Sequence, residues 1–245
     1  MNILGIIPAR YASSRFPGKP LVDIAGKSMI QRVYEQAKKC TSLTEVIVAT
    51  DDDRIYDHVL NFGGVAVMTA SDHQSGTDRC AEVALQHPQY NVIINIQGDE
   101  PYIDPEQITK VAACFSSADV QLATLIKKVA SFDELNNPNS PKVIINKLAE
   151  AIYFSRTPLP YLRGHEYKDW LNHYTYFKHI GIYGYRADVL QHVTKLPVSS
   201  LEKAESLEQL RWIENGYRIK VAETELETHA IDIPEDLEKL LKLNL

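Results

Sequence analysis

The chain has 245 residues, of which 44% are hydrophobic and 24% charged, and its formal net charge is −6. This length is enough for one large α/β domain, alone or with a sub-domain. The acidic balance argues against a nucleic-acid-binding protein, which would present a basic face. No apolar run approaches the roughly 20 residues that a membrane span needs, so we expect no membrane partner.

Cysteine usage and the first residues indicate the compartment. The three cysteines, Cys40, Cys80 and Cys114, lie far apart and form no Cys-x-x-Cys motif, which argues against structural zinc. A sparse, odd number of cysteines is typical of a reducing compartment. No secretory signal pattern precedes the first apolar run. We therefore expect a cytoplasmic protein.

The most informative segment follows the apolar run 3–7, which predicts a buried strand. Residues 8–20 contain three prolines and the cations Arg10, Arg15 and Lys19, and no acidic residue occurs before position 23. Such a segment cannot be a helix interior, so it predicts a stiff loop at the carboxyl end of a strand. Ligands of open α/β sheets bind at that edge, and fixed cations suit a polyphosphate.

Strand and helix patterns alternate through the first half and predict an α/β fold with a mostly parallel, doubly wound sheet. Ser28 with Gln31, and Asp104 with Gln107, match the capping-box pattern at helix starts. Further strands are expected at 45–50, 65–68 and 91–96, and helices from Asp53 toward Asn61 and at 76–85.

The alternation of strand and helix patterns ends at the break at 136–141. The pattern of the second half predicts a smaller β-rich sub-domain. We expect β segments at 142–146, 151–154, 176–185 and 218–223, and helices at 200–215 and 234–243. Residues 155–175 are expected to be irregular. The carboxylates of Glu202, Glu205 and Glu208 predict an acidic ridge on the helix 200–215, usually a solvated face.

Two carboxylates are candidates for a metal site. Asp99 follows the buried strand 91–96 and lies at the edge where phosphate oxygens would arrive, an arrangement that suits Mg²⁺. Helix capping is the alternative role, and it fits Glu100 and Asp104 better than Asp99. Asp232 precedes a helix, so capping is its default role, with a second metal carboxylate as the sharper option.

Two further patterns leave alternatives open. The small and amide side chains of 72–79 could read the edge of a base, or could form a plain helix N-terminus. Alternation along 176–185 places His179, Gly181 and Tyr183 on one face with room for a ligand, but a solvated antiparallel strand has the same pattern. The chain has no P-loop and no dinucleotide-binding G-x-G-x-x-G after its first strand.

The motifs taken together resemble those of one family. The chain is similar to the 3-deoxy-manno-octulosonate cytidylyltransferases, also called CMP-KDO synthetases, in segments that keep the family's order: 7–11, 15–21, 48–51, 72–77, 97–101, 153–156, 179–183, 207–211 and 232–237. This resemblance implies a Rossmann-like nucleotidyltransferase fold, a homodimer and Mg²⁺ dependence. It also implies the reaction of CTP with KDO, giving CMP-KDO and pyrophosphate for the lipopolysaccharide inner core.

The resemblance also implies roles for individual residues. The groups expected to act in catalysis are Arg10, Lys19, Asp99 and Asp232, of which Asp99 and Asp232 would hold Mg²⁺. The residues expected to bind CTP are Pro8, Ala9, Arg10, Ser13, Arg15, Lys19, Gln74, Ser75 and Gly76. Those expected to surround KDO are Gln97, Arg163, His179, Tyr183, Glu208 and Gln209.

The same resemblance implies which parts of the single domain, 1–245, bind each substrate. Residues 1–135 would form the CTP-binding core, about 136–215 the sugar-binding and dimerisation sub-region, and 216–245 a return to the core. No side chain stands out as a general base, so the metal is expected to acidify the attacking sugar hydroxyl. Whether one or two ions bind stays open.

Three rival functions remain. One is a cytidylyltransferase for a related acidic sugar, such as 8-amino-KDO or a sialic acid. Another is a metal-dependent glycosyltransferase, in which the run Asp51–Asp53 would be the metal motif. The third is a nucleotide-binding module without catalysis, which would not need the groups expected to surround the sugar.

Overall fold

The computed structural model describes residues 1–12, 16–227 and 230–242. Within this part of the chain, nine strands form one sheet in the order β11–β7–β10–β6–β1–β4–β5, and β8 joins it by pairing with β10 and β9. Its strands are β1 (Ile3–Ala9), β4 (Glu45–Thr50), β5 (Ala66–Met68), β6 (Val92–Asn95), β7 (Leu122–Lys128), β8 (Lys142–Ile145), β9 (Ala151–Ser155), β10 (Phe177–Arg186) and β11 (Ile219–Glu223). A separate hairpin consists of β2 (Asp23–Ile24) and β3 (Lys27–Ser28).

The expected mostly parallel sheet is confirmed, and β10 is the strand of the main path that departs from it. Strands β1, β4, β5 and β6 run parallel, as do β7 and β11, whereas β10 is antiparallel to both β6 and β7. Tyr183 pairs with Asn95, the last residue of β6. The residues of β10 that precede Tyr183 therefore continue past the carboxyl end of β6.

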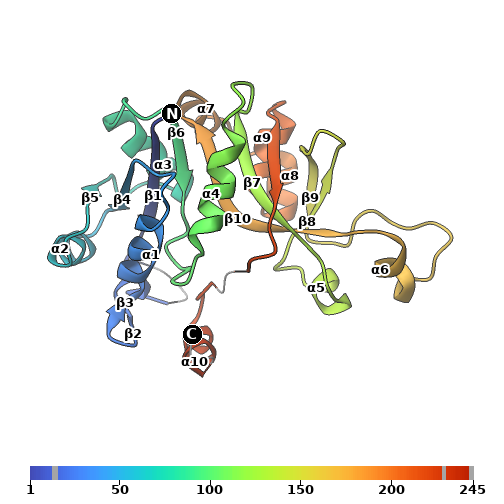
Figure 1. Ribbon diagram of the computed structural model, residues 1–245, viewed down its shortest axis with the longest axis horizontal. Coiled ribbons are helices and arrows are strands. Elements are labelled where there is room, and N and C mark those ends of the chain that lie inside the picture. Colours follow the sequence, from blue (N-terminus) through green and yellow to red (C-terminus); the bar gives the residue numbers. More distant parts are fainter. Residues whose placement is uncertain (13–15, 228–229, 243–245) are drawn as a thin grey trace.

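Helices cover both faces of the sheet (Figure 1). One buried cluster joins the sheet to α1 (Met29–Lys38), α2 (Asp53–Asn61) and α4 (Pro105–Cys114). A second cluster joins the opposite face to α3 (Gly76–Gln86), α7 (Ala187–Val193), α8 (Ser200–Glu205) and α9 (Gln209–Glu214). Strands β1, β4 and β6 contribute to both clusters, which explains their nearly continuous apolar sequences.

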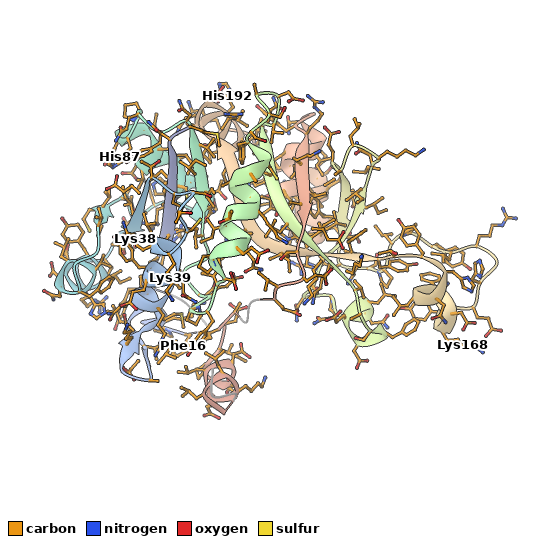
Figure 2. The ribbon with its side chains drawn as sticks, viewed as in Figure 1. Phe16, Lys38, Lys39, His87, Lys168 and His192 are labelled. Atoms are coloured by element: carbon orange, nitrogen blue, oxygen red, sulfur yellow. The ribbon has the colours of Figure 1, made fainter. Side chains whose placement is uncertain are left out.

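Two parts extend beyond this layered body. An arm at the right of Figure 1 contains α5 (Phe132–Asn136), the short helix η2 (Tyr167–Asp169) and α6 (Trp170–His173) around a small core of Leu135, Trp170 and Tyr176. Figure 2 shows Lys168 toward the end of this arm. On the other side, α10 (Pro234–Lys242) joins a cluster containing Ile24 and Met29, against which Phe16 packs. None of the described helices has the length and apolar character that a membrane crossing requires.

The prediction of one helix over 200–215 is wrong. The chain forms α8 and α9, separated at Ser206, whose φ of 52° is left-handed. The acidic ridge is lost with the helix. Glu202 forms a bidentate pair with Arg211, Glu205 accepts hydrogen bonds from Ser155 and Arg156, and Glu208 accepts one from Thr77. Each carboxylate is therefore held by a different partner and does not form a shared solvated face.

Two predicted capping boxes are half correct. Ser28 and Asp104 do cap α1 and α4, accepting hydrogen bonds from the backbone N–H groups of Gln31 and Glu106. The glutamine side chains act elsewhere: Gln31 donates to Glu35, and the buried Gln107 donates to the carbonyl of Leu226. A tertiary partner has replaced the local cap at Gln107.

Gly184 allows β10 to lie close to α4. A Cβ atom at this position would come within 2.5 Å of Phe115 and 2.8 Å of Val111. Gly181, three residues earlier on the same strand, would meet nothing within 4 Å. The two glycines therefore differ in packing, although they share a strand.

We expect Gly184→Ala to lower the free energy of unfolding by about 1–3 kcal/mol, the usual cost of forcing extra volume into a packed core. Gly181→Ala is the matched control and should change stability much less. Urea denaturation of both variants and of the unmodified chain measures the difference. Equal losses in the two variants would contradict the close approach of β10 to α4.

Candidate active site

A cleft of about 610 Å³ lies at the carboxyl ends of β1 and β6. Its lining comes from the loop after β1, the start of α3 and the turn after β6: Pro8, Ala9, Arg10, Ala12, Lys19, Pro20, Gln74, Gly76, Gln97, Gly98 and Asp99. Eight of these eleven residues are among those expected to bind a substrate or metal. The predicted Ser13 and Arg15 lie outside the described residues.

Glycine lets the walls of this cleft come together. A Cβ atom on Gly98 would lie 2.8 Å from the carbonyl oxygen of Pro8, and one on Gly76 would lie 3.1 Å from the Pro8 ring. The turn after β6 and the start of α3 therefore both pack against the first residue of the cationic loop. The sequence shows a glycine at position 98, between Gln97 and Asp99. It does not show why glycine is needed there, because the close contact is with Pro8, 90 residues earlier in the chain.

Lys19 is the central cation of the cleft. Its Nζ donates to Oδ2 of Asp99 and to the carbonyl oxygen of Ile231, both at 2.9 Å, and lies 3.7 Å from Oδ1 of Asp232. The lysine side chain is only 15% exposed, whereas those of Asp99 and Asp232 are 26% and 44% exposed. Three segments far apart in sequence thus meet at one ammonium group.

The two aspartates fit a magnesium site. Both carboxylates face the same cation, so the fold already gathers negative charge at this point. Mg²⁺ is commonly held by one or two carboxylates together with substrate phosphates, and the cleft beside Asp99 is lined by Arg10 and Lys19. In the described ranges, no three His, Cys, Asp or Glu side chains are grouped to hold a metal by themselves.

The segment 72–76 both caps a helix and lines the cleft. Ser75 and Asp78 form a complete capping box at the start of α3. The helix-start interpretation is confirmed, and Gln74 and Gly76 line the cleft, while the reading of a base by this segment stays a prediction. Arg10 donates to the carbonyl of His73, and the His73 ring is paired with Glu82. The cationic loop is therefore tied directly to the segment expected to read the base.

A buried arginine on α3, the helix that this segment caps, forms an ion pair that the sequence analysis missed. Arg79 on α3 is fully buried, lies 3.1 Å from the carboxylate of Asp51 and donates to the hydroxyl of Thr69. Next to it, Asp52 caps α2 and pairs with Arg54. Asp51 and Asp52 thus have structural partners. An arginine three residues after the first glycine of a helix carries no sequence signal of burial.

Most of the residues expected to bind the sugar lie near β10 and α9. His179 and Tyr183 lie on β10 with ring centroids 5.1 Å apart. Gln209 is buried at the start of α9, and Tyr183 packs edge-to-face against Trp212 of that helix. Gln97 instead lines the cleft at the carboxyl ends of β1 and β6.

Thr77 and Glu208 connect this group to the cleft. The Thr77 hydroxyl, one residue after Gly76, donates to Oε2 of Glu208 at 2.9 Å. Burial raises the pKa of Glu208 above its ordinary value, and the hydrogen bond from Thr77 only partly opposes this. Thr77 was not among the predicted residues, although its hydroxyl stands in the segment that was singled out.

Burial also sets the charge of His179. Its Nε2 lies 3.0 Å from the hydroxyl of Thr124, and loss of hydration lowers the pKa of the ring to about 3. At neutral pH the ring is therefore uncharged. The half-buried His179 ring can exchange hydrogen bonds with a ligand in its neutral form.

The structure does not bring Arg163 to the other predicted residues. It lies exposed in the segment between β9 and η2, which leads into the arm. No hydrogen bond or ion pair joins its side chain to another predicted site residue within the described chain. The position of Arg163 thus separates it from the group around β10 and α9.

Comparison with known proteins identifies the family. The cytidylyltransferase family model matches residues 4–221. Two proteins described as 3-deoxy-manno-octulosonate cytidylyltransferase are similar: one from Parabacteroides distasonis, 59% identical over 98% of this chain and 97% of its own, and one from Cytophaga hutchinsonii, 58% identical over 97% and 95%. A solved structure of CMP:2-keto-3-deoxy-manno-octonic acid synthetase complexed with CTP is 45% identical, with a TM-score of 0.92 over 100% of this chain and 98% of that one. The resemblance noted in the sequence is confirmed, and the chain belongs to the 3-deoxy-manno-octulosonate cytidylyltransferase family.

Proposed function

We propose that this protein transfers the CMP moiety of CTP to 3-deoxy-D-manno-octulosonate (KDO), giving CMP-KDO and pyrophosphate. The observation that carries this proposal is the convergence of Lys19, Asp99 and Asp232 beside the cleft. The family membership and the printed names of the similar proteins supply the substrates. In this reaction the anomeric hydroxyl of KDO attacks the α-phosphorus of CTP, and pyrophosphate leaves.

Charge neutralisation and positioning are the main tasks in transfers of this kind. Arg10 and Lys19 would offset the negative charge of the triphosphate, and Lys19 would exchange part of its contact with Asp99 for a phosphate oxygen. The direct hydrogen bond from Arg10 to the carbonyl of His73 would link phosphate binding to the segment that reads the cytosine. Gln74 and Gly76 would contact the base.

Asp99 and Asp232 would hold Mg²⁺, for the reasons of charge and donor type given above. When bound, this ion would supply Lewis-acid stabilisation of the phosphate charge. The aspartates themselves orient the Lys19 ammonium group between them. The ammonium group is thereby fixed at the mouth of the cleft before substrate arrives, which lowers the reorganisation needed during reaction.

The sugar would lie between the cleft and the group around β10 and α9. Glu208 and Gln209 would bind its hydroxyl groups, and His179 and Tyr183 would form the wall beside it. The carboxylate of KDO would be matched by a cation. Arg163 was expected in that role, and it would have to approach by movement of its exposed segment or from a second copy of the chain.

Further properties extend the proposal. The three cysteines are free, which supports the reducing environment of the cytoplasm. The exposed side chains of Tyr161, Tyr167 and Tyr174 on the arm support its use as a homodimer contact, since tyrosines are enriched at interfaces. CMP-KDO would be consumed in lipopolysaccharide inner-core synthesis.

A glycosyltransferase function receives less support. Its metal motif would be the run Asp51–Asp53, but Asp51 pairs with the buried Arg79 and Asp52 caps α2. Related acidic sugars, such as 8-amino-KDO, are the nearer alternative. 8-Amino-KDO differs from KDO at one substituent, so the two sugars must be separated by experiment.

Pyrophosphate release from CTP tests the proposed function. With Mg²⁺ present, we expect release only when KDO is added, in equal amount to CMP-KDO formed. Parallel reactions with 8-amino-KDO and a sialic acid rank the sugars by kcat/KM. Release without any sugar, or a higher kcat/KM for another sugar, would contradict the assignment of KDO as substrate.

Asp99→Asn tests the charge at the centre of the cleft. We expect kcat to fall by about 10²–10³-fold, the usual effect of removing one preorganised charge-stabilising group, with an unchanged melting temperature. Asp104→Asn is the matched control, since asparagine also caps helices well and Asp104 caps α4 outside the cleft. Turnover of Asp99→Asn within a few-fold of the unmodified enzyme would rule out the role given to Asp99.

The neutral state of His179 predicts a specific pH dependence. Since its folded-state pKa of about 3 lies below the unfolded value of roughly 6.5, the neutral ring favours the folded state above pH 6.5. This contribution is lost as the pH falls from 6.5 toward 3. We expect the His179 ring nitrogens to show constant NMR shifts from pH 5 to 8, unlike those of a histidine model peptide. A titration midpoint for His179 near 6.5 would contradict its burial.

A further inference from the structure

Glu227 lies on the segment that returns from the sheet to the active site. Strand β11 ends at Glu223, and the N–H of Thr224 then donates to the carbonyl of Ile126 on β7. Seven residues later, the chain reaches Ile231, whose carbonyl accepts the hydrogen bond from Lys19. Glu227 lies between these two attachments, just before residues outside the described part of the chain.

The carboxylate of Glu227 bridges two lysines. Its Oε2 lies 3.0 Å from Nζ of Lys127, and its Oε1 contacts Nζ of Lys178. Lys178 is nearly completely buried and also pairs with Glu134 on α5 at 3.0 Å. Glu227 therefore contacts the sheet through two charges at once.

The Glu227 carboxylate offsets the repulsion between two neighbouring lysines of the sheet. Lys178 on β10 and Lys127 on β7 are directly paired across the antiparallel strands, and like charges placed opposite one another repel. Burial alone would lower the pKa of Lys178, but its contacts with Glu227 and Glu134 keep the pKa above the ordinary value. Two charged lysines side by side thus make a fixed docking point for one glutamate.

The docking point is also next to the sugar-binding group. Lys178 precedes His179, and a cavity of about 150 Å³ is lined by Glu227, Lys178, His179, Gly181 and Glu100, among others. Glu100 in turn follows Asp99. The bridge therefore joins the strand that carries His179 to the segment that leads to Asp232.

We propose that Glu227 is a positioning residue: by bridging Lys127 and Lys178, it fixes the segment that carries Ile231 and Asp232 against Lys19. The reaction-related part of this inference rests on the proposed function, because it concerns the ability of Asp232 to hold Mg²⁺. The structural part does not, because the contact between Ile231 and the Asp99 turn exists without any ligand.

Hydrogen exchange in the substrate-free, metal-free protein tests the structural part. The N–H of the buried Ile231 donates to the carbonyl oxygen of Asp99 at 2.9 Å. In Glu227→Gln, which keeps the shape but removes the charge, we expect this N–H to exchange faster by on the order of tenfold, since the buried Lys178 and the half-buried Lys127 lose the carboxylate they share. Unchanged exchange in Glu227→Gln would overturn the proposal.

Glu223→Gln is the matched control. Glu223 also pairs with a β7 lysine, Lys128 at 3.2 Å, but both of these side chains are exposed and Glu223 precedes the returning segment. In Glu223→Gln, the N–H of Ile231 should exchange at the same rate as in the unmodified chain. Glu227→Asp keeps the charge on a shorter side chain and should restore part of the protection. Equal acceleration in Glu223→Gln would overturn a specific role for Glu227.

The dependence of rate on Mg²⁺ tests the link to the reaction. We expect Glu227→Gln to need on the order of tenfold more Mg²⁺ for half-maximal CMP transfer, with KM for CTP little changed at saturating Mg²⁺. Faster exchange with an unchanged Mg²⁺ requirement would overturn the link to Asp232. If the unmodified chain shows no CMP transfer, the proposed function fails, while the exchange experiment still decides the role of Glu227.

Discussion

The ammonium group of Lys19 joins three parts of the chain that the sequence keeps far apart. It contacts Asp99 after β6, the carbonyl of Ile231 before α10 and, at greater distance, Asp232. Because Lys19 is largely buried, these attractions are screened less than they would be at the surface. Without the ammonium group, the Asp99 and Asp232 carboxylates would lie near each other with no cation between them. The shape of the cleft therefore depends on this one cation.

The direction of β10 determines what lies beside that cation. A parallel strand in this position would direct its amino end to the opposite edge of the sheet. Because β10 is antiparallel to β6 and β7, Tyr183 pairs with the last residue of β6 and His179 continues past its carboxyl end. Thr77 and Glu208 complete the connection from the first turn of α3 to the start of α9. One reversed strand thus brings the residues expected to bind the sugar near those expected to bind the nucleotide.

Groups at the ends of secondary structure serve the site as well as the fold. Ser75 caps α3 while its neighbours Gln74 and Gly76 line the cleft. Asp52 caps α2, and the adjacent Asp51 pairs with the buried Arg79 of α3. Rigid caps and buried pairs reduce the conformational freedom of these loops. A recognition segment supported in this way keeps its geometry before a ligand binds.

The amino-acid sequence alone was enough for the α/β class and most strand and helix positions, because local apolar periodicity and loops at strand ends depend on neighbours in the chain. The family resemblance, together with the cationic loop and the turn after β6, pointed to eight residues that line the cleft: Pro8, Ala9, Arg10, Lys19, Gln74, Gly76, Gln97 and Asp99. Only the tertiary structure decided the break at Ser206, the partners of Glu202, Glu205 and Glu208, and the neutral state of His179. It also revealed the pairs Arg79–Asp51 and Lys178–Glu227. Burial and ion pairing between distant segments arise from packing, and a charged residue in a sequence carries no mark of the partner that will cover it.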